Sequence, residues 1–105
     1  MLSIEQTIEP KMCTNMTEVR EGVDAVDRAL VALLAKRFAY MDAAARIKTD
    51  RQLVRDEARK AQVLGNIADS AKSAGLPVDQ LVNLWDSLVE MSIAYELDRW
   101  DERTR

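Results

Sequence analysis

The sequence predicts an all-α fold in which each chain forms three helices and two chains assemble as an intertwined homodimer. The chain has 105 residues, enough for one domain, and only three Gly and two Pro to form turns. From about Thr17 to Trp100 it is rich in Ala, Leu, Glu, Lys, Arg and Gln, the residues that favour helices most strongly. Apolar residues also recur there at steps of three and four, the spacing of an amphipathic helix.

Residues 1–16 lie outside the helical pattern. We expect them to form a flexible N-terminal extension, and residues 17–105 to form the helical domain. The extension has neither the basic start nor the apolar stretch of a signal peptide, so we expect a cytoplasmic protein.

The first helix is predicted from Thr17, as its N-cap, to about Lys48. Its inward stripe begins with five apolar residues: Val19, Val23, Val26, Leu30 and Leu33. The same spacing leads next to Arg37 and ends at Lys48, so two cations stand on the stripe that the helix should bury.

The second helix is predicted from about Leu53 to Ala74, with Gly75 directly after its end. Pro77 suits the first turn of a third helix, which runs from about Val78 to Trp100. The third helix has Leu81, Trp85 and Leu88 on its inward side.

The length of the first helix predicts the homodimer. A helix of 17–48 spans roughly 46 Å at 1.5 Å per residue, whereas a compact domain of this size is only about 33 Å across. The two shorter helices cannot cover it from end to end. A second copy, packed antiparallel about a two-fold axis, would complete the burial of its apolar stripe.

Composition excludes several classes of function. The net charge is −3, from 15 basic and 18 acidic residues, and no basic face is evident, so we expect no nucleic-acid partner. The chain has one Cys and no His, so we expect no disulfide, no metal site and no cofactor. No apolar run approaches the roughly 18 residues of a membrane span.

The two inward cations can be explained in two ways. Arg37 and Lys48 are 11 residues apart, which places them within about 20° of each other around the helix and roughly 16 Å apart along it. Each side chain could bury its stem and extend its charge to water. Alternatively, the two side chains could bind the two ends of one small anion.

Polar residues interrupt the other helices as well. The inward stripe of the third helix continues to Ser92 and Glu96, and the second helix begins with Arg55, Asp56 and Arg59. In an up-down-up arrangement these positions meet near Lys48. A polar pocket with excess positive charge inside a helical bundle suits a small dianion. Because it offers no evident nucleophile, it points to chemistry that needs only positioning and electrostatics.

Four sequence segments carry a family resemblance: "VREGVDAVDRALVALLAKR", "AARIK", "VRDEARK" and "LVEMSIAYE". Together they resemble the all-helical chorismate mutases of the AroQ class over about residues 17–100. The ending "IAYELDRW" is similar to the isochorismate-pyruvate lyases, which share that fold. The resemblance implies a domain-swapped dimer that rearranges chorismate to prephenate, on the route to Phe and Tyr. Each of its two sites would use one residue from the partner chain.

The resemblance assigns roles to four residues. Arg37 and the partner's Arg20 would hold the substrate carboxylates, Lys48 would stabilise charge on the ether oxygen, and Glu96 would approach that oxygen from the other side. Arg20 precedes Arg37 by 17 residues, roughly 25 Å along one helix, so the two cannot meet at one small ligand within a chain. An antiparallel partner can bring Arg20 there.

Four further residues match positions around the substrate. Arg55 and Asp56 match positions near its hydroxyl and the mouth of the site, Arg59 matches the wall, and Ser92 matches a carboxylate contact. The sequence departs from the family pattern at two residues and in the connection after Lys48, which is about one residue shorter than in several bacterial members. Glu96 stands where many bacterial members have Gln, and Lys60 stands where several bacterial mutases have a Glu that contacts the substrate hydroxyl.

The sequence therefore leaves three hypotheses. The leading one is a chorismate mutase acting on a small dianionic substrate. The second is an isochorismate-pyruvate lyase on the same scaffold, although "VRDEARK" lacks the Pro-rich loop associated with the lyases. The third is a non-catalytic helical dimerisation module, which would have no reason to bury Arg37, Lys48 and Glu96.

Overall fold

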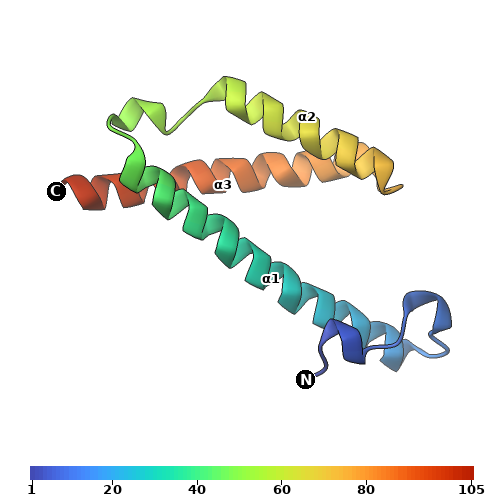
Figure 1. Cartoon of the computed structure of the whole chain (residues 1–105). Coiled ribbons are helices and arrows are strands. Elements are labelled where there is room, and N and C mark those ends of the chain that lie inside the picture. The colour runs from blue at the N-terminus through green and yellow to red at the C-terminus, as the bar shows by residue number, and fades with distance from the viewer. The chain divides into compact units, whose positions relative to one another are not determined.

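The computed structural model describes residues 1–105 and contains only helices. The long helices are α1 (Met16–Ile47), α2 (Glu57–Ser73) and α3 (Val78–Thr104), and the short 3-10 helices are η1 (Ile4–Gln6), η2 (Pro10–Met12) and η3 (Arg51–Leu53) (Figure 1). The predicted all-α class and its three main helices are confirmed. The chain divides into two compact units, Met1–Arg37 and Phe38–Arg105.

In the first unit, Asn15 caps α1. Its Oδ1 atom accepts a hydrogen bond of 2.9 Å from the backbone N–H of Glu18, and the Glu18 carboxylate accepts one of 2.9 Å from the backbone N–H of Thr14. This reciprocal arrangement satisfies N–H groups that have no partner within the helix. The prediction of Thr17 as the N-cap is therefore wrong, because Asn15 makes that bond and Thr17 lies inside the helix.

Residues 1–15, the N-terminal segment, contain both η1 and η2. The backbone N–H of Ser3 donates to Gln6 Oε1 at 2.9 Å, and Thr7 Oγ1 donates to the Ile4 carbonyl at 2.6 Å, which closes the turn of η1. The Arg28 guanidinium donates to the carbonyl of Leu2 and so connects the start of the segment to α1.

In the second unit, α2 and α3 lie antiparallel and side by side (Figure 1). The turn between them uses Gly75 at a φ of 71°, a left-handed conformation that glycine adopts without a steric penalty. The N–H groups of Gly75 and Leu76 donate to the carbonyls of Lys72 and Ala71, which completes a Schellman motif. Gly75 therefore ends the helix as predicted, and Pro77 precedes α3 as its N-cap.

The start of α2 differs from the prediction. Asp50 accepts from the backbone N–H of Gln52 at 2.9 Å and opens η3, whereas Asp56 accepts from that of Arg59 at 3.0 Å and opens α2. Two separate caps therefore divide the predicted helix, and α2 begins at Glu57 rather than near Leu53. At the other end of the unit, α3 continues to Thr104, beyond the predicted limit of Trp100.

The core of the second unit is small. Val54, Val89 and Ile93 are buried together, with Leu97 and Trp100 among the half-buried residues that pack against them. None of the helices is long and apolar enough to cross a membrane.

In the first unit, the predicted inward stripe of α1 is largely uncovered in the single chain. The exposed fractions of its five apolar residues range from 37% at Val19 to 64% at Leu33. This is the face for which the sequence predicts a second copy as cover, and the dimer itself remains a prediction.

Candidate functional site

Lys48 and Glu96 form a largely buried ion pair. Lys48 directly follows α1, and its backbone N–H still donates to the carbonyl of Ala44 at 2.9 Å. Its Nζ lies 2.7 Å from Oε2 of Glu96 on α3. Glu96 is only 4% exposed, whereas 27% of the Lys48 side chain is exposed. Two residues that the sequence places in one site are therefore in direct contact.

Trp100 and the η3 turn support this pair. Trp100 lies one turn after Glu96, and its Nε1–H donates to the backbone carbonyl of Lys48 at 3.4 Å. Arg51 of η3 binds both carboxylate oxygens of Asp101, at 2.9 and 3.2 Å. The hydrogen bond from Arg51 lowers the pKa of Asp101. Both contacts join the chain just after α1 to the C-terminal half of α3.

A second cluster joins the last part of α1 to α3. The rings of Phe38 and Tyr95 meet edge to face, with centroids 4.9 Å apart. The Tyr95 hydroxyl donates to the Asp42 carboxylate at 3.0 and 3.1 Å, and the Arg99 guanidinium lies 5.0 Å from the Tyr95 ring centre. Sequence reasoning missed this cluster. The one signal available in the sequence was Tyr95, an aromatic residue directly before the inward Glu96.

Ser92 lies on α3 one turn before Glu96 and is also buried. Its Oγ donates to the Leu88 carbonyl at 2.7 Å, a common way for a serine to satisfy its hydroxyl within a helix. The structure thus places Ser92 on the same face of α3 as Glu96.

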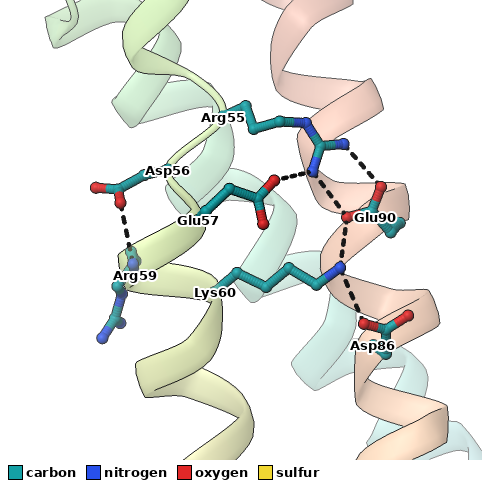
Figure 2. A network of polar contacts seen from close by, with 7 residues as sticks. All are labelled: Arg55, Asp56, Glu57, Arg59, Lys60, Asp86 and Glu90. Carbon is teal, nitrogen blue, oxygen red and sulfur yellow. Dashed lines mark hydrogen bonds and ion pairs between the residues drawn. The ribbon is translucent and has the colours of Figure 1, made fainter.

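Arg55 and Lys60 bind the middle of α3 (Figure 2). Arg55 holds Glu90 with two hydrogen bonds, of 2.7 and 3.1 Å, and also contacts Glu57 at 2.9 Å. Lys60 Nζ lies 2.9 Å from Glu90 and 2.9 Å from Asp86. The hydrogen bonds from Arg55 and Lys60 lower the pKa of Glu90 to about 2. In turn, Glu90 raises the pKa of both Arg55 and Lys60.

Asp56 and Arg59 lie on the other side of the α2 start in Figure 2, away from Glu90. Asp56 caps the helix, and the Arg59 guanidinium donates to Gln62 Oε1 at 2.7 Å. The predicted residues of the "VRDEARK" segment are thus divided. Arg55 reaches α3, while Asp56 and Arg59 make their contacts within α2.

Arg20 and Arg37 both lie on α1 within the first unit. Because they are 17 residues apart on one helix, roughly 25 Å, they cannot contact one small ligand within a chain. Their expected meeting at one site needs a second copy of the chain.

The site is electrostatic in character. No group of three or more His, Cys, Asp or Glu residues is placed to hold a metal ion. The Lys48 ammonium and the Glu96 carboxyl are fixed opposite each other in a largely buried position. Charged groups held this way can stabilise charge that develops on a bound molecule without forming a covalent bond to it.

The chain is similar to known proteins over most of its length. Residues 19–97 match the family described as chorismate mutase type II, a range that includes α2 and both members of the Lys48–Glu96 pair. The chain is also similar to an isochorismate pyruvate lyase from Pseudomonas aeruginosa. The two are 29% identical over 91 residues, which cover 87% of this chain and 90% of that protein.

Proposed function

Because the chain belongs to the type II chorismate mutase family, we propose that it is a homodimeric enzyme that rearranges chorismate to prephenate. The observation that carries the proposal is the Lys48–Glu96 pair, a cation and a carboxyl group 2.7 Å apart and largely buried. An ion pair in this position is costly to bury and is a weak source of stability, so a role in binding or catalysis accounts for it better.

The reaction is a single intramolecular reorganisation of bonds, which needs no nucleophile, acid or base. The enzyme must hold the substrate in its reactive conformation and stabilise the charge that grows on the ether oxygen. We assign this charge stabilisation to Lys48, whose ammonium would turn from Glu96 to the substrate. A roughly million-fold acceleration corresponds to about 8 kcal/mol, and one well-placed donor typically supplies about 3–4 kcal/mol.

Glu96 would face the same oxygen from the opposite side. As a carboxylate it would repel the growing charge, and as a carboxylic acid it would donate a hydrogen bond to it. Replacing Glu96 by Gln leaves a permanent donor of similar shape, and we expect this variant to keep its activity.

The substrate carboxylates would be held by Arg37 and the partner's Arg20, since arginine binds carboxylates with two parallel hydrogen bonds. The exposed apolar stripe of α1 supports a dimer that would deliver Arg20. We keep Ser92 as a further carboxylate contact.

Arg55, Asp56 and Arg59 are proposed near the substrate hydroxyl and the wall of the site. In the free chain Arg55 is bound to Glu57 and Glu90, so substrate binding there would require it to exchange a partner. We place the reaction in the cytoplasm, on the route to Phe and Tyr.

An isochorismate pyruvate lyase is the second candidate. The similar protein from Pseudomonas aeruginosa carries that name, and the match covers most of both chains. A lyase would use the same cations to hold a dianion, so the proposed site suits either substrate.

The deciding experiment offers the purified protein chorismate and isochorismate in parallel. Loss of chorismate absorbance with formation of prephenate supports the mutase, and pyruvate release from isochorismate alone supports the lyase. Lys48→Ala should lower kcat/KM by about a hundredfold or more, while the matched control Lys72→Ala, an exposed lysine at the end of α2, should not change it. No turnover of either substrate would contradict both candidates and favour a non-catalytic helical dimer.

A further inference from the structure

The N-terminal segment lies beside the first turns of α1 (Figure 1). Side chains of the segment and of α1 line a cavity between them. The cavity has a volume of about 470 Å³. Its walls are mainly apolar and include Ile4, Ile8 and Cys13 of the segment and Val19, Val23 and Val26 of α1. The fit is loose, because Ile4 and Val23 remain 49% and 52% exposed.

Val19, Val23 and Val26 begin the stripe that the proposed dimer would bury. In an antiparallel pair of α1 helices, the residue numbers of two facing positions have a constant sum. If Arg20 of one copy faces Lys48 of the other, that sum is about 68. The α1 residues that line the cavity, between Glu18 and Asp27, then face about residues 41–50 of a second copy. The N-terminal segment therefore occupies the position that residues 41–50 of the second copy would take in the proposed dimer.

Few contacts hold the segment in this place. Its one hydrogen bond to a distant residue is that from Arg28 to the Leu2 carbonyl, and its other bonds join residues no more than five apart. Arg28 is nine residues after Val19, on the opposite side of α1, so this contact does not use the apolar stripe. The segment can leave the stripe by losing one long-range hydrogen bond and a loosely packed apolar contact.

We propose that the N-terminal segment is a removable cover that competes with a second copy of the chain for the apolar stripe of α1. This inference rests on the proposed function, because delivery of Arg20 to the partner's site requires that stripe to be free. Dimer formation and activity are then set by the same competition. A single chain with its cover in place holds an incomplete site.

The test weakens the cover in the full-length chain. Ile4→Ser combined with Ile8→Ser removes two apolar walls of the cavity and leaves α1 unchanged. The matched control is Glu5→Ser with Lys11→Ser, two exposed residues of the same segment that do not line the cavity. Analytical ultracentrifugation measures the dimer dissociation constant, and enzyme assays over a dilution series measure specific activity.

We expect the Ile4/Ile8 variant to have a dissociation constant lower by about tenfold, and to keep its activity at dilutions where the native chain loses it. The control should match the native chain. Arg28→Ala, which releases Leu2 without touching the stripe, should also strengthen the dimer. A dissociation constant equal to that of the native chain would show that the N-terminal segment does not compete with a second copy. A weaker dimer also overturns the competition, because the segment would then belong to the interface.

Failure of this inference differs from failure of the proposed function. If the native chain turns over chorismate and the Ile4/Ile8 variant has an unchanged dimer dissociation constant, only the proposed role of the N-terminal segment is contradicted. If the native chain turns over neither substrate but the Ile4/Ile8 variant has the expected lower dimer dissociation constant, only the proposed function is contradicted.

Discussion

Removing either member of the Lys48–Glu96 pair should destabilise the protein to very different extents. Lys48→Met leaves the Glu96 carboxylate, only 4% exposed, without its cation. Stranding a buried charge costs about 3–5 kcal/mol, and the partial exposure of the Lys48 position favours the lower end, about 3 kcal/mol. Glu96→Gln leaves the Lys48 ammonium without its carboxylate. Because 27% of the Lys48 side chain is exposed, water can still solvate the ammonium, and we expect the free energy of unfolding to fall by only about 1 kcal/mol.

The assay is urea denaturation followed by circular dichroism, at one fixed chain concentration because dimerisation shifts apparent stability. With a slope of about 1.5 kcal/mol per molar urea, the midpoint should fall by about 2 M for Lys48→Met and by less than about 1 M for Glu96→Gln. The double variant Lys48→Met/Glu96→Leu has no charge to strand and should recover most of the lost stability.

Activity should separate from stability in these variants. The double variant should be stable and inactive, whereas Glu96→Gln should be slightly less stable and active. Lys72→Met is the control for loss of a lysine elsewhere. If Lys48→Met proves no more destabilising than Glu96→Gln, burial does not make an unpaired Glu96 carboxylate costly, which contradicts the expected role of the ion pair.

Three further predictions concern other groups. Arg37→Ala should lower kcat/KM by about a hundredfold or more with the oligomeric state unchanged by ultracentrifugation, and near-native activity would remove Arg37 from the site. Mixing inactive Arg20→Ala with inactive Lys48→Ala chains should restore part of the activity once subunits exchange, and no recovery after verified exchange would refute a site shared between chains. The pKa of Glu90 is lowered from 4.5 to about 2, so its contribution to stability is complete above about pH 4.5 and is lost as pH falls toward 2. Glu90→Gln should therefore weaken the acid dependence of the thermal midpoint, and an unchanged dependence would show that the carboxylate does not stabilise the fold.

The long helices could be predicted because each has a continuous rhythm of apolar residues. The predicted first helix, 17–48, and the observed α1, Met16–Ile47, differ by one residue at each end. The separation of η3 from α2 could not be predicted in the same way, because Leu53 and Val54 fit the apolar pattern of a continuous helix. Local hydrogen bonds to Asp50 and Asp56 decide that break.

The Lys48–Glu96 contact could be anticipated because both residues interrupt an apolar stripe. Glu90 had no such signal, since it lies off the predicted inward stripe and therefore resembles a solvated position of α3. Its contacts with Arg55 and Lys60 depend on how α2 is aligned along α3. That alignment follows from the turn at Gly75 and the packing of both helices, which the pattern of a single helix does not contain.

The C-terminal half of α3 is fixed by polar contacts at three places: Tyr95 with Asp42, Glu96 with Lys48, and Asp101 with Arg51. Successive residues of a helix point about 100° apart, so these contacts hold α3 from different directions and resist its rotation about its own axis. Dissolved salt weakens exposed ion pairs much more than buried ones. Rising ionic strength should therefore loosen the exposed Arg51–Asp101 contact before the buried Lys48–Glu96 pair. The end of α3 would then fray first, and the geometry of the proposed site would be lost last.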